Sequence, residues 1–139
     1  MGVLKVIADT NLWVAAWFNP KSYSARILNM AGEGRLMLLW SPETRRELEK
    51  ILRNIKATPE FLVAVERLLL LGTNVGKTER LTVIKDDPDD NKFLACARAG
   101  SADYIITNDD HLLALEIFDT TRIVTPKVFL EDFRKRQAR

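Results

Sequence analysis

Residues Ile84–Asp109 read IKDDPDDNKFLACARAGSADYIITND, a stretch that combines an acidic cluster, a helix and an apolar run. Pro88 suits the first turn of a helix, because proline lacks the N–H group that would stay unpaired there. Inward spacing of apolar residues then predicts a helix over Asn91–Ala99. Tyr104–Thr107 is a short apolar run typical of a buried strand, and the polar residues Asn108–Asp110 follow it at once. The stretch therefore places acids on both sides of one helix–strand pair.

These acids have two explanations. Acids favour helix N-termini and exposed loops, where the macrodipole and water stabilise them, and a single cluster is usually explained in that way. This stretch carries two clusters, each next to a predicted buried element and separated by one helix. That arrangement favours a metal site.

Length and composition indicate one globular domain over residues 1–139. The chain is 47% hydrophobic and 29% charged, which is ordinary for a soluble protein. Its one cysteine, Cys96, has no disulfide partner, which fits a reducing compartment. We recognise no signal peptide and no apolar run long enough to span a bilayer, so we expect a cytoplasmic protein without membrane contact.

The net charge of +2 is too small to indicate a nucleic-acid partner by itself, and its distribution says more. Basic residues gather in two places, which are Arg134, Lys135, Arg136 and Arg139 in the C-terminal tail and Arg45, Arg46, Arg53 and Lys56 along one predicted helix. A solvated tail is the simpler interpretation of the first group. Contact with phosphates is the alternative for both groups.

The rest of the chain alternates between strands and helices. We expect strands at Val3–Ala8, Leu36–Trp40 and Arg122–Thr125, with a loop over residues 73–78 and a short extended element at Leu81–Ile84. Helices are expected to begin near Leu12, Ser22 or Ser24, Pro42, Pro59, Leu112 and Pro126. This alternation predicts an α/β fold with a parallel sheet covered on both faces.

Three acids stand where predicted strands or loops pass into helices: Asp9, Asp90 and Asp109. Right-handed crossovers bring successive strand ends to the same edge of a sheet, so these residues can converge although they are far apart in sequence. For Asp9 alone, a helix N-cap is the simpler explanation. Glu43 or Glu47 can join the group from the helix that follows the second strand.

The choice of acid on that helix stays open at this point. Glu47 and Glu49 each lie about 100° to one side of the buried Leu48, so periodicity does not say which of them faces a site.

Carboxylates that converge in this way repel one another unless they are protonated or neutralised by a cation. Oxygen ligands suit Mg²⁺ or Mn²⁺, and the sequence lacks the Cys/His pattern of a zinc site. A divalent ion held by carboxylates activates water and stabilises charge on a phosphate, as in metal-dependent nucleases. The single histidine, His111, is interpreted as a surface or helix-start residue and not as a base.

Four motifs in order, IADTNLW, SPETRREL, DPDDNKFLACA and DYIITNDDHLL, resemble the PIN (PilT N-terminal) domain and most closely its toxin-type branch. The resemblance extends over nearly the whole chain. It implies a three-layer α/β/α sandwich with a central, mainly parallel sheet of four to five strands. It also implies a metal-dependent endoribonuclease, often dimeric and often inhibited by an antitoxin encoded beside it.

Carried over position by position, the resemblance assigns the catalytic and metal-binding residues. They are Asp9, Glu47, Asp90 and Asp109, with Glu47 as a ligand or as a base that orients water, and with Thr10, Asn11, Thr107 and Asn108 as supporting polar residues. The resemblance thus favours Glu47 over Glu49. Asp87, Asp89 and Asp110 are additional acids, which we expect to cap helices.

The sequence therefore predicts a Mg²⁺- or Mn²⁺-dependent ribonuclease, the toxin component of a toxin–antitoxin module. Its expected partners are an RNA substrate, a cognate antitoxin and a second copy of the chain in a homodimer.

Two alternatives belong to other classes. A phosphoryl-transfer enzyme of the dehalogenase type needs a second aspartate where Asn11 stands, and a phospho-receiver needs an acidic pair where Thr10 follows Asp9. A non-catalytic RNA-binding or interaction domain, whose acids only cap helices, would bind RNA without cleaving it.

Overall fold

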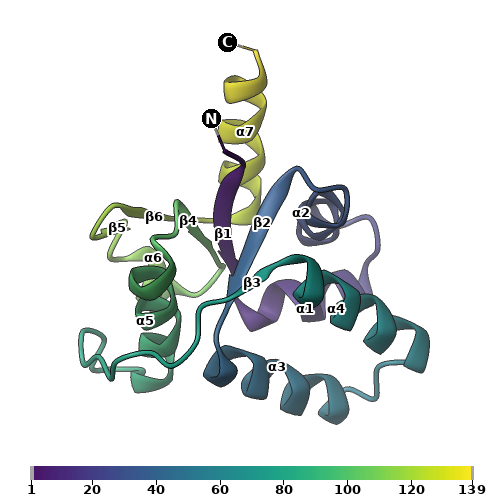
Figure 1. Cartoon of the computed structure of the whole chain (residues 1–139), viewed down its shortest axis with the longest axis horizontal. Helices are drawn as coiled ribbons and strands as arrows, with labels where there is room; N and C mark the ends of the chain where they lie inside the picture. The colour runs from purple at the N-terminus through teal and green to yellow at the C-terminus, as the bar shows by residue number, and fades with distance from the viewer. Residues whose placement is uncertain (1, 139) are drawn as a thin grey trace.

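A six-stranded sheet forms the centre of the fold in a computed structural model that describes residues 2–138. The strands are β1 (Leu4–Ala8), β2 (Leu36–Trp40), β3 (Thr73–Asn74), β4 (Tyr104–Ile106), β5 (Ile117–Phe118) and β6 (Thr121–Val124). Their order across the sheet is β3-β2-β1-β4-β6-β5. All neighbouring strands are parallel except β5 and β6, which pair antiparallel (Figure 1). The predicted α/β class with a mainly parallel sheet is confirmed.

Helices cover both faces of this sheet. They are α1 (Thr10–Phe18), α2 (Tyr23–Gly32), α3 (Pro42–Asn54), α4 (Pro59–Leu71), the 3-10 turn η1 (Pro88–Asp90), α5 (Asn91–Gly100), α6 (Asp110–Leu113) and α7 (Pro126–Gln137). Helices α1 to α4 and α7 pack into one apolar core with one face of the sheet, whereas α5 and α6 pack into a second core with the other face. The three-layer α/β/α arrangement is therefore confirmed.

Alternation along the strands explains why two cores form. Neighbouring residues of a strand point to opposite faces, and here both faces are buried. In β1, Val6 lies in the core with α1 and α2, and the next residue, Ile7, lies in the core with α5. In β4, Ile105 and Ile106 divide between the cores in the same way, and both are fully buried. A β-rich run without polar alternation is thus what this sheet requires.

The predicted helix starts are confirmed by their caps. The side chains of Ser41 and Thr58 each accept a hydrogen bond from a backbone N–H in the first turn, of α3 and α4 respectively, and a proline follows each of them. Ser22 rather than Ser24 caps α2. Such caps satisfy N–H groups that the helix itself leaves unpaired.

The extended element predicted at Leu81–Ile84 is wrong, because these residues form no strand. The backbone N–H of Ile84 donates to Asn91 Oδ1 at 2.8 Å, and Asn91 Nδ2 donates to the carbonyl of Ile84 at 2.8 Å. A side-chain amide therefore satisfies the groups that a neighbouring strand would otherwise pair. The edge position beside β2 is taken instead by β3, within the segment predicted to be a loop.

The sheet has more strands over residues 2–138 than the four to five expected, since β3 and β5 are two residues long. Such short strands are too brief to show an alternating pattern in the sequence. Among the helices that the structure describes, none is long and apolar enough to cross a membrane.

Candidate metal centre

The carboxyl end of β1 delivers Asp9 to the edge of the sheet. Asp9 is the N-cap of α1, and its Oδ1 accepts a hydrogen bond from the backbone N–H of Asn11 at 3.4 Å. Its Oδ2 accepts a shorter bond, 2.6 Å, from the hydroxyl of Thr107, which follows the adjacent strand β4. Asp9 is only 5% exposed, and burial raises the pKa of its carboxyl, as do the charges of Glu47 and Asp109 to a smaller extent. The capping explanation for Asp9 is therefore correct, although it accounts for only one of the two oxygens.

Asp90 lies at the end of η1, directly before α5, and is 7% exposed. Its Oδ2 is buried and has no hydrogen-bond partner, the one such side-chain atom found in residues 2–138. Burial raises the pKa of Asp90 to about 7, and the neighbouring carboxyl of Asp109 is the next largest cause. A buried acid without a partner oxygen or nitrogen is costly unless something else binds it.

Asp109 stands after β4 as the N-cap of α6. Its Oδ1 accepts hydrogen bonds from the backbone N–H groups of His111 at 2.8 Å and Leu112 at 3.3 Å. The N–H of Asp109 itself donates to the Thr107 hydroxyl at 2.9 Å. Thr107 thus connects the carboxylate of Asp9 with the backbone of Asp109, and it is fully buried.

Asp90 and Asp109 belong to a close group that we call the metal centre: Asp87, Asp90, Asp109 and His111. Each offers one potential ligand atom, and the four atoms lie within 4.8 Å of one another. Asp9 is not one of these four residues. His111 Nδ1 lies 3.7 Å from an oxygen of Asp109 and 3.9 Å from an oxygen of Asp87.

The structure corrects the role expected for Asp87. This residue stands at the N-cap of η1 but its side chain makes no capping hydrogen bond. Its carboxylate lies with Asp90 and Asp109 instead. Asp110 stands in the first turn of α6, where an acid is favoured. His111 is also a helix-start residue, as predicted, and its side chain is 48% exposed. Its closeness to the acids was missed, although the short spacing from Asp109 was a signal.

Glu47 lies outside this close group and has its own partners. The Thr10 hydroxyl donates to Glu47 Oε2 at 2.5 Å, and Lys92 Nζ lies 3.0 Å from Oε1. Glu49 instead faces Arg45 at 3.7 Å and has a 49% exposed side chain. Of the two acids between which periodicity left a choice, Glu47 is therefore the one that contacts the residue next to Asp9.

The four polar supporting residues divide into two kinds. Thr10 and Thr107 are buried, and each donates a hydrogen bond to one of the predicted acids. Asn11 and Asn108 are exposed, and neither side chain makes a hydrogen bond to the described part of the chain. The threonines hold carboxylates in place, whereas the asparagines have no such contact.

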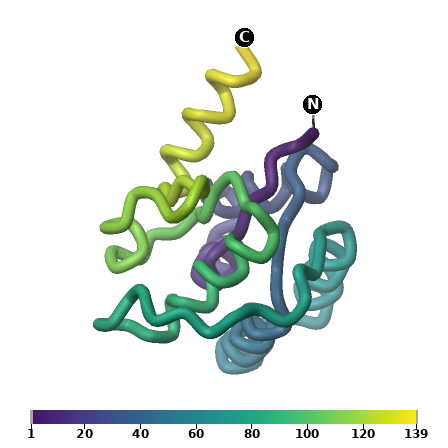
Figure 2. The backbone as a smooth tube through the Cα atoms, turned by 60° about the vertical axis from the view of Figure 1, so that its left-hand side comes forward, coloured from purple at the N-terminus to yellow at the C-terminus, as the bar shows by residue number. Residues whose placement is uncertain are grey.

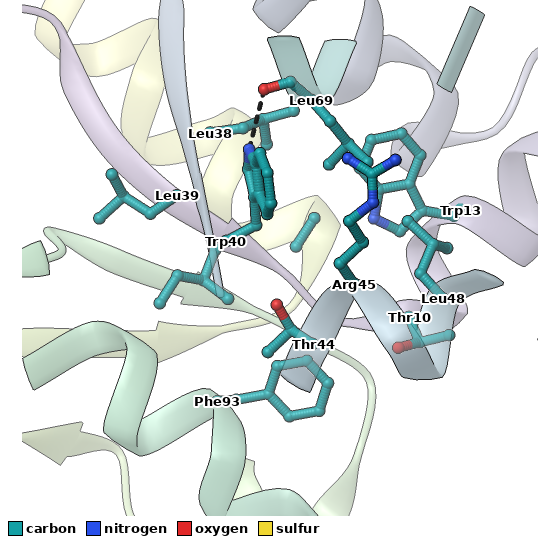
Figure 3. A pocket seen from close by; sticks show the side chains of 12 residues that line it. Thr10, Trp13, Leu38, Leu39, Trp40, Thr44, Arg45, Leu48, Leu69 and Phe93 are labelled. Carbon is teal, nitrogen blue, oxygen red and sulfur yellow. Dashed lines mark hydrogen bonds between the residues drawn. The ribbon is translucent and has the colours of Figure 1, made fainter. Parts of the chain in front are cut away.

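Helix α3 carries Glu47, and packing around Trp40 fixes its position (Figure 3). The indole N–H of Trp40 donates to the carbonyl of Leu69 at 2.8 Å, and the guanidinium of Arg45 lies 5.4 Å from the indole ring. A cavity of about 20 Å³ beside them is lined mostly by apolar side chains, among them Phe93. This cavity has room for about one water molecule, so it is a packing feature and not a ligand site.

The metal centre fits a divalent cation. Its donors are three carboxylates and one imidazole, and one of the carboxylates keeps a buried oxygen without a partner. Repulsion between the acids, which contributes to the raised pKa values of Asp9 and Asp90, would be relieved by a bound cation.

Known proteins resemble this chain in sequence and in fold. The sequence pattern of a family described as PIN domain matches residues 5–111. The uncharacterized protein MJ1680 of Methanocaldococcus jannaschii is 28% identical over 149 aligned positions, which cover 95% of this chain and 93% of that protein. The crystal structure of PAE2754 from Pyrobaculum aerophilum has the same fold, with a TM-score of 0.53 and 15% sequence identity over 97% of this chain and 99% of that one.

Proposed function

The chain belongs to the PIN domain family, and from this premise we propose that it is a divalent-metal-dependent endoribonuclease. PIN domains are generally metal-dependent nucleases, and the acidic cluster of such an enzyme is present here. The finer parts of the proposal are the substrate, which we take to be RNA, the metal, which we take to be Mg²⁺ or Mn²⁺, and the residues that act.

One observation carries the proposal. The carboxylate of Asp90 is buried, its Oδ2 has no partner, and three further potential ligand atoms lie within 4.8 Å. Structural acids are normally buried with their partners in place. An acid that is buried without one, beside other acids, is what a cation-binding site requires.

We assign Asp9, Asp90 and Asp109 as metal ligands. Asp87 and His111 are close enough to Asp90 and Asp109 to contribute further ligands. The mainly oxygen donor set favours Mg²⁺ or Mn²⁺. When bound, such an ion lowers the pKa of water and stabilises negative charge on a phosphate.

Glu47 is assigned as a ligand or as the group that orients the attacking water. Thr10 and Lys92 hold its two oxygens, so the carboxylate has a fixed direction. Lys92 also supplies a positive charge beside this carboxylate. The Thr107 hydroxyl orients Asp9 in the same way.

We further propose that the protein is the toxin of a toxin–antitoxin module and acts as a homodimer with a cognate antitoxin as partner. The resemblance of its four motifs to the toxin-type branch supports this role. Exposed apolar residues of α4, among them Val63 and Leu70, are 70% and 74% exposed and support a protein interface on that helix.

The test is cleavage of a panel of labelled RNAs by purified protein with Mg²⁺, with Mn²⁺ and with EDTA. We expect cutting in both metals, no cutting in EDTA, and loss of cutting in Asp9→Asn. A matched control is Asp86→Asn, which removes an exposed acid outside the metal centre and should cleave normally. Normal cleavage by Asp9→Asn, or equal cleavage in EDTA, would show that the site is assigned wrongly. RNA binding without cleavage in any metal would favour the non-catalytic alternative.

A further inference from the structure

A groove of about 790 Å³ lies beside the metal centre, and Glu47 is among the residues that line it. Its walls are α3, the segment of residues 79–85 and the start of α5. Figures 1 and 2 show this segment crossing from β3 along the lower side of the molecule to a bend that leads into α5. The groove therefore opens directly onto one of the acids assigned above.

The groove is lined by five basic residues, Arg46, Lys50, Arg80, Lys85 and Lys92, and by four acids, Glu43, Glu47, Glu79 and Asp89. Two of the four acids that line the groove already have cations, because Glu47 contacts Lys92 and Glu79 contacts Arg98.

The other four basic residues are exposed, and none forms an ion pair in the part of the chain that the structure describes. They come from two walls, with Arg46 and Lys50 on α3 and Arg80 and Lys85 on the crossing segment. Unpaired cations on facing walls are suited to a polyanion that lies between them.

The residues that line the groove also indicate which part of such a ligand they would contact. No aromatic side chain is among the described residues that line the groove. Proteins that hold bases of single strands usually stack them on aromatic rings, whereas the backbone is held by lysine and arginine. The groove has the lysine and arginine residues that hold a backbone, and it has no aromatic ring on which a base could stack.

The wall formed by the crossing segment is held in place. The Asn91 amide bonds both backbone groups of Ile84, and Arg98 contacts Glu79 at 3.2 Å. The groove is thus formed before any ligand arrives.

We propose that this groove binds the sugar–phosphate backbone of a single RNA strand, independently of its bases, and leads it to Glu47. This inference rests on the proposed function for its choice of RNA. A groove of this volume is of the size that encloses part of one extended strand. Base selectivity would then have to arise elsewhere, at the cut itself or in the shape of the RNA.

The test is binding of fluorescent 12-nucleotide single strands, measured by anisotropy in EDTA over a range of NaCl concentrations. The groove variant is Arg46→Gln/Lys50→Gln/Lys85→Gln, which keeps Lys92. The matched control is Arg134→Gln/Lys135→Gln/Arg136→Gln, which removes three exposed charges from the end of α7. That end lies on the opposite side of the molecule from α3 (Figure 1). Thermal melting verifies that both variants fold, and Arg46→Lys/Lys50→Arg/Lys85→Arg should restore binding.

We expect the groove variant to weaken binding about tenfold or more and to lower the slope of log K against log[NaCl] by about two, since each lost phosphate contact accounts for about 0.7. The control should change affinity less than about twofold, and strands of oligo-A and oligo-U should bind alike. Equal weakening by the control, or a preference for one base that is lost in the groove variant, would overturn the proposal. No binding by the unaltered protein at low salt would also overturn it.

Two further arms separate this proposal from the proposed function. If groove-dependent binding is found but no metal cleaves the RNA, the groove stands and the nuclease does not. If cleavage is seen but the groove variant binds and cuts normally, the reverse holds. A DNA strand of the same length distinguishes RNA from a general preference for phosphates.

Discussion

Two clusters of charged residues in this molecule contain acids from different parts of the chain. They differ in whether a cationic side chain neutralises the acids. In the first, the metal centre, Asp90 is buried with a free oxygen among other potential ligand atoms. In the second, Arg98 lies between Asp119 and Glu79, at 3.0 and 3.2 Å, in an exposed position. The second cluster supplies its own cation, and the first does not. The comparison teaches that proximity of acids is not the mark of a functional site, whereas burial without compensation is.

The largest expected difference between the clusters is in catalysis. Asp90→Asn should lower the rate of metal-dependent RNA cleavage by more than about 100-fold. Even the loss of a residue that only hydrogen-bonds a metal ligand lowers metal affinity or activity about 10- to 100-fold. Asp119→Asn removes an acid of the other cluster and should leave the rate unchanged. Initial rates at saturating Mg²⁺ provide the measurement. Similar losses in the two variants would remove the distinction drawn here.

The second-largest expected difference between the clusters is in the stabilisation of the protein by metal. At a metal concentration about 100-fold above its Kd, the folded protein should gain about 2.7 kcal/mol, which raises the melting temperature by roughly 8 °C. Asp119→Asn should show the full rise and Asp90→Asn only a small part of it. A scan of melting temperature against Mn²⁺ concentration measures both. A full rise in Asp90→Asn would place the metal elsewhere.

The pH dependence of stability should have opposite signs in the two clusters. In EDTA, folded Asp90 keeps its proton up to about pH 7, whereas the unfolded chain loses it near the ordinary pKa of 3.8. Between these values the folded state binds more protons, so its contribution to the free energy of unfolding falls as pH rises from about 4 to 7. Asp9, whose pKa is also raised by burial, acts in the same direction.

For Asp119 the hydrogen bond from Arg98 lowers the pKa, so its contribution is present above the ordinary value and is lost as the pH falls through the folded value. Urea unfolding in EDTA from about pH 2 to about pH 8 tests both signs. Asp90→Asn should flatten the fall towards neutral pH, and Asp119→Asn should affect only the acid end. A stability that rises steeply from pH 4 to 7 in the unaltered protein would contradict the assignment.

The smallest effect should come from the arginine of the balanced cluster. Arg98→Gln should cause a slight fall in melting temperature, because exposed ion pairs contribute little to stability. The metal-induced rise should be unchanged. RNA binding in the groove should weaken slightly, since Glu79 in the groove wall loses its partner. The same melting and anisotropy measurements detect these changes, and a large fall in stability would show that this cluster is structural.

Much of the fold was predictable because its signals are local. A run such as Leu36–Trp40 is apolar and β-rich, and Ser41 followed by proline begins a helix by well-defined chemistry. Two-residue strands carry no such pattern. The failure at Leu81–Ile84 has a specific cause, because the partner of that backbone is the side chain of Asn91, which no propensity encodes.

The candidate site also contains residues that the sequence predicts and residues that it does not. Residues at the ends of strands, such as Asp9 and Asp109, were predictable because parallel topology determines where strand ends lie. Asp87 was not, since an acid before proline is usually a cap, and for His111 the only signal was its short spacing from Asp109. Whether an oxygen is left without a partner, as in Asp90, depends on packing from several elements and is visible only in three dimensions.

Three consecutive residues at the start of α5 serve three different parts of the molecule. Asp90 belongs to the metal centre, Asn91 holds the groove wall through Ile84, and Lys92 contacts Glu47. One inserted residue here would turn the following side chains by about 100° around the helix axis. The contacts with the metal centre, with Ile84 and with Glu47 could then no longer form at the same time. Insertions should therefore be tolerated within residues 77–83 but not within 88–92, and an insertion scan scored by Mn²⁺-induced stabilisation would reveal that boundary. The tolerance of this protein to changes in length is thus set by a single helical turn.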